Sequence, residues 1–237
     1  MQDTKICLIT GVGDGTGAAL ARRFAQGGYR VAMLARNAPR LATLAQEIPN
    51  SRAFACDVGD EAALRACLAE VRSQMGDPSV VIHNAAAAEG LMQDFRAVST
   101  VQLGVNFRVN TAALLVLAQE LTPAMERAGQ GALLVTGNTG ALRGVARYAS
   151  FAPTKASQRI LAESLARDLG PKGVHVAYFV IDAFIDMPFI REHFHPDKPD
   201  DFFAKPSAIA EEFYRVAHQD RSAWSFNVEL RPFGERW

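Results

Sequence analysis

The chain alternates short runs of β-branched residues with longer stretches of helical period. The runs that predict strands cover residues 5–10, 30–34, 52–55, 79–83, 132–136, 174–180 and 225–230. Helical periodicity fills the spaces between them, for example over residues 15–26 and 156–169. Because such an alternation builds right-handed crossover units, it predicts an α/β fold. We expect one domain, residues 1–237, in which a doubly wound parallel sheet of seven strands carries helices on both faces.

The charge balance, the length of the apolar runs and the cysteines indicate which kinds of partner to expect. Lys plus Arg and Asp plus Glu both number 25, so no net field attracts nucleic acid or an acidic membrane surface. The longest apolar run, residues 112–118 (AALLVLA), is far shorter than the ~20 residues of a membrane span. Cys7, Cys56 and Cys67 show no CxxC or metal-type spacing, which predicts reduced thiols in a cytoplasmic protein. We therefore expect a small-molecule substrate, no nucleic acid and no membrane.

A glycine cluster, TGVGDGTG at residues 10–17, directly follows the first predicted strand and opens into a helix. Glycines at this place let the backbone turn tightly and bring main-chain N–H groups and a helix N-terminus up to a pyrophosphate. Turns alone could explain a glycine cluster elsewhere in a chain. The position after the first strand indicates a nucleotide site.

The same cluster resembles the TGxxxGxG motif of the short-chain dehydrogenase/reductase family, with Gly11, Gly15 and Gly17 in register. CDV at residues 56–58 and HNAA at residues 83–86 resemble two further motifs of that family, the second with His and Ala in place of Asn and Gly. The resemblance runs over nearly the whole chain and implies a Rossmann-like domain that binds NAD(P). The cofactor contacts that it implies are Gly11, Gly13, Asp14, Gly15, Thr16, Gly17, Ala35, Arg36, Asn37, Asp57, Val58, Asn84, Ala85, Ala86, Lys155 and Ile185, with Met187 as an alternative to Ile185.

The end of the second predicted strand favours NADP over NAD. An NAD site normally ends this strand with a carboxylate that binds the ribose hydroxyls and would repel a 2′-phosphate. Here Ala35 stands where that carboxylate is expected, and Arg36 follows it. A guanidinium suits a 2′-phosphate in geometry and charge. Asp14 argues against NADP, because members of the family that use NADP often carry a basic residue in the glycine loop.

The resemblance also implies a catalytic set of Asn, Ser, Tyr and Lys, of which this chain matches part. Asn110 fits the Asn position, and Asn138 stands at the Ser position. The YxxxK motif reads FxxxK, with Phe151 and Lys155. In the resembled mechanism Lys155 would bind the nicotinamide ribose, Asn138 would polarise a substrate oxygen, and Asn110 would hold a water.

Phe151 has no proton to give, and this leaves three interpretations open. The first is carbonyl/alcohol hydride transfer with a proton from water or from Tyr148, since loss of one general acid costs ~10²–10⁴ in rate. The second is an NADP-binding module that is catalytically impaired and acts as a sensor or interaction subunit. The third is a different chemistry that keeps the cofactor. The first interpretation is favoured, because a loss of that size slows hydride transfer without necessarily abolishing it.

Residues 184–206 break the alternation with a stretch rich in Pro, Asp and Phe, which predicts a substrate lid. Its phenylalanines suggest a partly hydrophobic substrate. His193 and His195 have no further ligand at recognisable spacing, so we expect no metal. The resembled family forms dimers and tetramers, and we expect a homodimer or homotetramer here as well.

Overall fold

The computed structural model describes residues 5–234 and contains the predicted parallel sheet. Its strand order is β3-β2-β1-β4-β5-β6-β9, and every neighbouring pair is parallel. All seven predicted strands are confirmed, with ends that differ by a few residues. Their bounds are β1 (Ile6–Thr10), β2 (Arg30–Ala35), β3 (Ser51–Ala55), β4 (Val80–His83), β5 (Gly131–Asn138), β6 (Val174–Ile181) and β9 (Asn227–Leu230).

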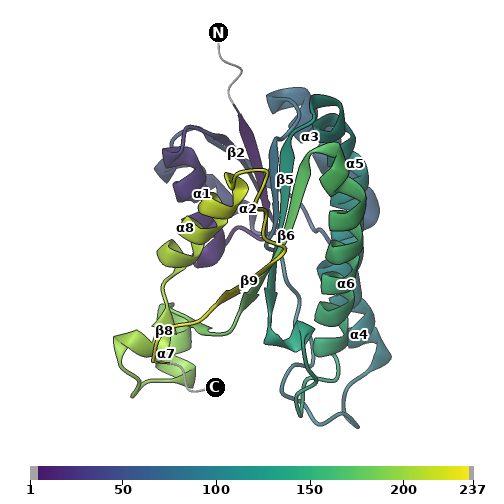
Figure 1. Cartoon of the computed structure of the whole chain (residues 1–237). Helices are drawn as coiled ribbons and strands as arrows, with labels where there is room; N and C mark the ends of the chain where they lie inside the picture. The colour runs from purple at the N-terminus through teal and green to yellow at the C-terminus, as the bar shows by residue number, and fades with distance from the viewer. Residues whose placement is uncertain (1–4, 235–237) are drawn as a thin grey trace.

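Helices cover both faces of the sheet (Figure 1). On one face lie α1 (Thr16–Gln26), α2 (Ala38–Glu47) and α8 (Pro206–Ala217). On the other lie α3 (Glu61–Met75), α4 (Thr100–Phe107), α5 (Ala113–Ala128) and α6 (Ala152–Leu169). Each face has its own apolar core, and β1 and β6 are buried along their whole length, as expected for the interior of a parallel sheet. The predicted three-layer fold is thus confirmed.

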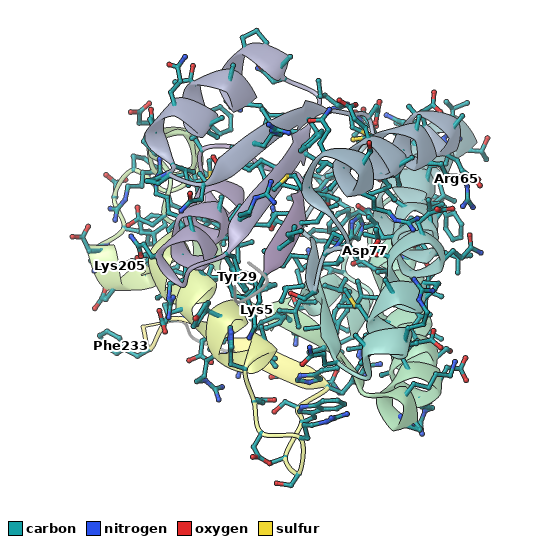
Figure 2. All side chains as sticks on the ribbon, turned by 90° about the horizontal axis from the view of Figure 1, so that it is seen from above. Lys5, Tyr29, Arg65, Asp77, Lys205 and Phe233 are labelled. Carbon is teal, nitrogen blue, oxygen red and sulfur yellow. The ribbon has the colours of Figure 1, made fainter. Side chains whose placement is uncertain are left out.

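Side chains fill the space between the sheet and the helices on both sides (Figure 2). Tyr29, labelled there, precedes β2, and its ring packs edge-on against Phe24 of α1 and Tyr214 of α8. Its hydroxyl bonds Nε2 of His218 at 3.0 Å. This aromatic contact fixes α1, the helix that starts at the glycine loop, against α8.

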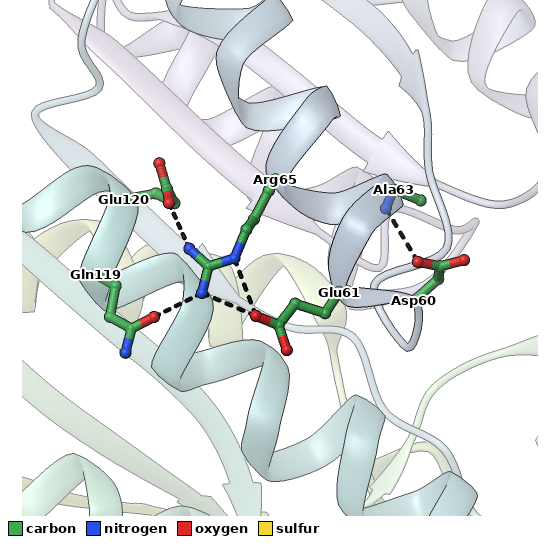
Figure 3. A network of polar contacts seen from close by, with 6 residues as sticks. All are labelled: Asp60, Glu61, Ala63, Arg65, Gln119 and Glu120. Atoms are coloured by element: carbon green, nitrogen blue, oxygen red, sulfur yellow. Dashed lines mark hydrogen bonds and ion pairs between the residues drawn. The ribbon is translucent and has the colours of Figure 1, made fainter.

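The start of α3 is fixed by polar contacts drawn in Figure 3. Asp60 caps the helix by accepting a hydrogen bond from the Ala63 N–H at 3.0 Å. One turn on, the Arg65 guanidinium binds Glu61 on its own helix, and Gln119 and Glu120 on α5. These contacts hold α3 to α5 and so position the segment that joins β3 to α3.

One long helical segment, from Thr100 to Ala128, joins α4, the π-helical turn η1 (Arg108–Ala112) and α5. By length and composition alone it would be apolar enough to cross a membrane, although half of its most apolar window is buried inside the fold. It packs on the sheet and on α3 and α6, as a core helix does.

Residues 184–206 are folded as well. They form β7 (Phe184–Ile185), α7 (Pro188–Phe194), the 3₁₀ turn η4 (Asp200–Phe202) and β8 (Phe203–Ala204), with β7 paired to β8. Arg191 ties them together, because it binds Asp186 at 2.6 Å and Asp200 at 2.9 Å and stacks over the Phe203 ring. The segment lies at the end of the molecule where the strands finish (Figure 1). Two further 3₁₀ turns, η2 (Thr139–Ala141) and η3 (Gly170–Lys172), flank α6.

Candidate active site

The glycine loop approaches other backbone so closely that side chains would not fit. A Cβ at Gly11, where φ is +70°, would lie 2.5 Å from the Cα of Ala85, and one at Gly17 would lie 2.6 Å from the Gly11 carbonyl oxygen. Gly13 has open space, and its nearest neighbour is the Arg40 guanidinium. No described side chain caps α1, and although the Ala18 N–H donates to the Gly13 carbonyl oxygen at 2.9 Å, the N–H groups of Thr16 and Gly17 at the helix start stay available for an anion.

A cavity of about 1000 Å³ opens beside this loop, along the carboxyl ends of β1 to β4. Ten of the predicted cofactor residues line it: Gly11, Gly13, Ala35, Arg36, Asn37, Asp57, Val58, Asn84, Ala85 and Ala86. The other six, Asp14, Gly15, Thr16, Gly17, Lys155 and Ile185, do not. The size and the glycine-loop wall suit an extended nucleotide.

Arg40 also lines this cavity, and sequence reasoning did not single it out. It follows Asn37, whose side chain caps α2 by accepting from the Arg40 N–H at 3.0 Å. Its guanidinium lies 3.3 Å from the Asp14 carboxylate, so the acidic residue of the glycine loop is paired with a cation. A basic residue in the first turn of the helix after Arg36 is the sequence signal that could have found it.

Asn84 links three strand ends beneath the cavity. Its Nδ2 donates to the Gly11 carbonyl at 3.0 Å, and its Oδ1 accepts from the Thr136 hydroxyl at 3.1 Å. Asp57 is turned toward its own loop, where Oδ1 accepts from the Gly59 N–H at 2.9 Å.

His83 is buried below Asn84 and holds one defined tautomer. Its Nε2 lies 3.1 Å and 3.3 Å from the carbonyl oxygens of Val109 and Asn110, which can only accept. Nε2 therefore carries the proton, and Nδ1 accepts from the Thr10 hydroxyl at 3.0 Å. Burial, with a smaller contribution from the nearby Lys155 charge, lowers the pKa of His83 to about 4. The ring is neutral at physiological pH and acts as a spacer between strands and η1.

Asn110 lies in η1, and both polar atoms of its side chain form hydrogen bonds. Its Oδ1 accepts from the Ala87 N–H at 2.9 Å, and its Nδ2 donates to the Ala87 carbonyl at 3.0 Å and to the Thr154 hydroxyl at 2.9 Å. Asn110 therefore joins the loop after β4 to the first turn of α6. Its main-chain carbonyl is bound by Nε2 of Gln158 at 2.6 Å.

Lys155 is almost wholly enclosed. Its Nζ donates to the Thr136 carbonyl at 3.1 Å and to Oε1 of Gln158 at 3.0 Å. Phe151, also buried, is the residue directly before α6, and its ring centre lies 6.0 Å from Nζ. Burial away from water lowers the pKa of Lys155 to about 7. This amine therefore titrates near neutrality.

Asn138 ends β5, where its Oδ1 accepts from the Gly140 N–H at 3.0 Å. Tyr148 is half-buried in the turn before α6, with its ring 6.2 Å from that of Phe151. It lines a second cavity, of about 560 Å³, together with Phe95 and residues of the loop after β5. The structure thus brings Phe151 and Lys155 together and sets Tyr148 beside the ring, outside the helix.

Residues 184–206 touch the glycine loop through Met187. The Met187 sulfur lies 2.5 Å from the position that a Cβ on Gly15 would take, so Gly15 leaves room for this side chain. Ile185 packs against the core on the α1 side of the sheet. Three rings of this segment, Phe184, Phe189 and Phe194, are exposed, while Phe203 is buried. Among the described residues no group of three or more His, Cys, Asp or Glu is arranged to hold a metal ion.

The sheet order, with its reversal beside β1, and the glycine cradle at the strand ends define a nucleotide-binding α/β protein. Residues 5–186 match the family described as short chain dehydrogenase, so the chain belongs to the short-chain dehydrogenase family and is an oxidoreductase of that type.

Several characterised proteins resemble this chain. A 7alpha-hydroxysteroid dehydrogenase of Escherichia coli (strain K12) is 30% identical over 183 residues, which cover 73% of this chain and 69% of the relative. An alcohol dehydrogenase of the archaeon Thermococcus sibiricus, solved with 5-hydroxy-NADP, superposes with a TM-score of 0.85 at 24% identity over 98% of both chains. A 3-ketoacyl-(acyl-carrier-protein) reductase of Brucella melitensis, solved with NADH, gives 0.87 at 24% identity over 98% of this chain and 99% of the other. The two solved structures establish the likeness of fold.

Proposed function

We propose that this protein is an NADP(H)-dependent oxidoreductase that transfers hydride between the nicotinamide and a carbonyl or alcohol substrate. The observation that carries the proposal is the single cavity of about 1000 Å³ that joins the glycine loop to the ends of β2, β3 and β4. Gly11 and Gly17 fit a dinucleotide because only glycine allows the close backbone approach that forms the cradle. When bound, the cofactor supplies the hydride.

NADP is favoured over NAD by charge at the cavity rim. Ala35 offers no carboxylate to the adenosine ribose, and Arg36 and Arg40 both line the cavity. Two guanidinium groups suit a 2′-phosphate, whereas a ribose with free hydroxyls would lack its usual acidic partner. The Arg40 partner Asp14 orients that guanidinium and reduces its net charge. The related solved structures include both an NADP-type and an NADH complex, so the preference comes from this chain's own residues.

The roles proposed for the catalytic residues are those that the resemblance to the family implies. We assign Lys155 to the nicotinamide ribose and Asn138 to the substrate oxygen, since an amide donates a hydrogen bond without titrating. Asn110 shapes the site by fixing Ala87 and Thr154. Phe151 stands where the family's tyrosine is expected, and its ring cannot supply a proton. The proton then comes from Tyr148, beside the Phe151 ring, or from water held near Lys155.

The proposal extends to residues 184–206, to the oligomeric state and to the cellular location. We propose that residues 184–206 close over a partly hydrophobic substrate, because Phe184, Phe189 and Phe194 remain exposed on this segment. We also propose a homodimer or homotetramer, since Phe107 and Ile160 are exposed on the helices that cover one sheet face. Three buried, unpaired cysteines support a reducing, cytoplasmic location.

NADPH absorbance in the presence of a panel of carbonyl compounds tests the function. We expect slow oxidation by the native protein, loss of activity in Lys155→Ala, and an increase of ~10²–10⁴ in Phe151→Tyr because the new phenol can donate a proton. Tyr148→Phe separates the proton sources: loss of activity assigns the proton to Tyr148, and unchanged activity assigns it to water.

An inactive native protein that binds NADPH and gains activity with Phe151→Tyr would favour the second candidate, a cofactor-binding module. The observation that favours this candidate is the buried hydrocarbon ring beside Lys155. Inactivity of both proteins toward every carbonyl, despite NADPH binding, would contradict the hydride-transfer proposal.

A further inference from the structure

Gln158 is a fully buried polar residue that neither the family motifs nor the sequence assigns to the site. It lies on α6 three residues after Lys155. Its Oε1 accepts from the Lys155 ammonium at 3.0 Å and from the Tyr178 hydroxyl at 3.2 Å. Its Nε2 donates to the Asn110 carbonyl at 2.6 Å. One side chain therefore connects α6, β6 and η1 directly behind Lys155.

The chemistry of the neighbours fixes the orientation of this amide. An ammonium can only donate, so the atom that faces Lys155 must be the oxygen. A carbonyl can only accept, so the atom that faces Asn110 must be the nitrogen. Both requirements are met at once, and a flipped amide would violate both.

The groups that face Lys155 from the packed elements carry no opposite charge. His83 on β4 is neutral at physiological pH, and Tyr178 on β6 has its pKa raised by burial, so it keeps its proton. β5 contributes the Thr136 carbonyl, while Arg108 on η1 is exposed at the cofactor cavity. Within residues 5–234, no carboxylate forms an ion pair with Lys155, so Gln158 Oε1 is its side-chain acceptor.

We propose that Gln158 is a positioning residue that holds the Lys155 ammonium for the cofactor and closes the inner end of the site by occupying the Asn110 carbonyl. The cofactor part of this inference rests on the proposed function. Its structural part, the hold on Lys155, rests on the three hydrogen bonds alone.

The consequence concerns proton movement. An amide does not gain or lose a proton near neutrality. Because Gln158 lies between Lys155 and the Asn110 carbonyl, the Lys155 ammonium faces a neutral amide on the η1 side and has no titratable partner there.

The test is the titration of Lys155 in the full-length protein, followed by NMR of ¹³C,¹⁵N-labelled lysine and assigned with Lys155→Met. The variants are Gln158→Glu and Gln158→Met, with Gln130→Glu, an exposed glutamine, as the matched control. A carboxylate beside the ammonium should raise the titration midpoint by about one pH unit or more. Methionine removes a hydrogen bond to a charged group and should lower it by about one unit. Gln130→Glu should leave it unchanged.

Thermal unfolding shows which variants fold, and either folded Gln158 variant decides the question. An unmoved midpoint in a folded variant overturns the inference, because a purely structural glutamine would leave the titration where it is. NADPH fluorescence titrations across the same pH range give the second readout. We expect the affinity to fall as pH rises through each protein's own Lys155 midpoint.

The two proposals fail in different ways. If NADPH does not bind the native protein but the NMR midpoints shift as expected, the proposed function is wrong and the hold on Lys155 stands. If NADPH binds with a pH dependence that all variants share, Gln158 does not position Lys155 for the cofactor, and that part of the inference is wrong.

Discussion

The Nζ atom of Lys155 lies 6.0 Å from the centre of the Phe151 ring, so the residue four positions before the buried amine offers it a hydrocarbon ring without a hydroxyl. A cation at that distance gains little from the ring. The charge of Lys155 is stabilised mainly by the Thr136 carbonyl and the Gln158 amide. An ammonium that is held by neutral groups in a dry site destabilises the fold for as long as it keeps its charge.

Lys155→Met should remove a pH dependence of stability. Burial lowers the pKa of Lys155 from its ordinary value of 10.5 to about 7 in the folded state, so between these values the unfolded chain binds more protons. Unfolding free energy therefore rises with pH across this window, by up to about 1.4 kcal/mol for each pKa unit of difference. We expect urea unfolding of the native protein to show this slope and Lys155→Met to lack it. Lys5→Met, at an exposed lysine, should keep the slope. Equal slopes in all three proteins would show that Lys155 titrates normally.

Gly11→Ala should damage the fold and the cofactor site together. The residue has φ of +70°, and a Cβ would meet the Ala85 backbone at 2.5 Å, a contact that no side-chain movement relieves. We expect a loss of roughly 2–4 kcal/mol of unfolding free energy, the scale of a severe steric change. Gly13→Ala, where the space is open, should leave the melting temperature nearly unchanged. Similar melting temperatures for the two variants would contradict the close approach described for Gly11.

Arg36→Ala and Arg40→Ala should each weaken NADP binding by about tenfold or more, the scale of a lost charge-assisted hydrogen bond. NAD binding should change little, because NAD lacks the 2′-phosphate that these residues are proposed to contact. Calorimetric titration with both dinucleotides measures the ratio directly. Arg127→Ala, at an exposed arginine far from the cavity, is the control. Equal losses of affinity for NAD and NADP would mean that the guanidinium groups do not bind the 2′-phosphate.

Arg191→Ala should loosen residues 184–206 without unfolding the sheet. The guanidinium binds Asp186 and Asp200 and covers the Phe203 ring, so its loss frees both ends of the segment. We expect limited proteolysis within this segment at least several times faster than in the native protein, while the thermal unfolding of the domain shifts by a few degrees at most. Arg143→Ala, in the loop after β5, serves as the comparison. Unchanged cleavage in Arg191→Ala would show that the other contacts suffice.

Much of the fold was predictable, because the buried strands of a parallel sheet appear in the sequence as separate apolar runs. β1 and β6 are buried on both faces, and both appear as nearly continuous apolar segments, interrupted in β6 by His175. The sequence showed residues 184–206 only as a break in the alternation, since β7 and β8 have two residues each and are held by Arg191 across the segment. Such short elements carry no periodicity.

Residues of the candidate site could be predicted where a motif sets the course of the backbone. They could not be predicted where the site depends on side chains from distant parts of the sequence that meet only in the fold. The glycine loop and Asn84 were found from their place after strands. Gln158 was not found, because its partner Asn110 is 48 positions away in the sequence. Asn110 also lies in a π-helical turn, which no periodicity in the sequence predicts. Arg40 was missed for a similar reason: its pairing with Asp14 depends on where α2 begins.

Calorimetric titration of the purified, folded protein with NADP and, separately, with NAD tests nucleotide binding most directly. We expect saturable heat with one site per chain and a lower dissociation constant for NADP. If neither dinucleotide gives heat and a second binding assay also finds no binding, the proposed nucleotide site is contradicted, because the loop formed by Gly11, Gly13 and Gly17 would then bind no dinucleotide.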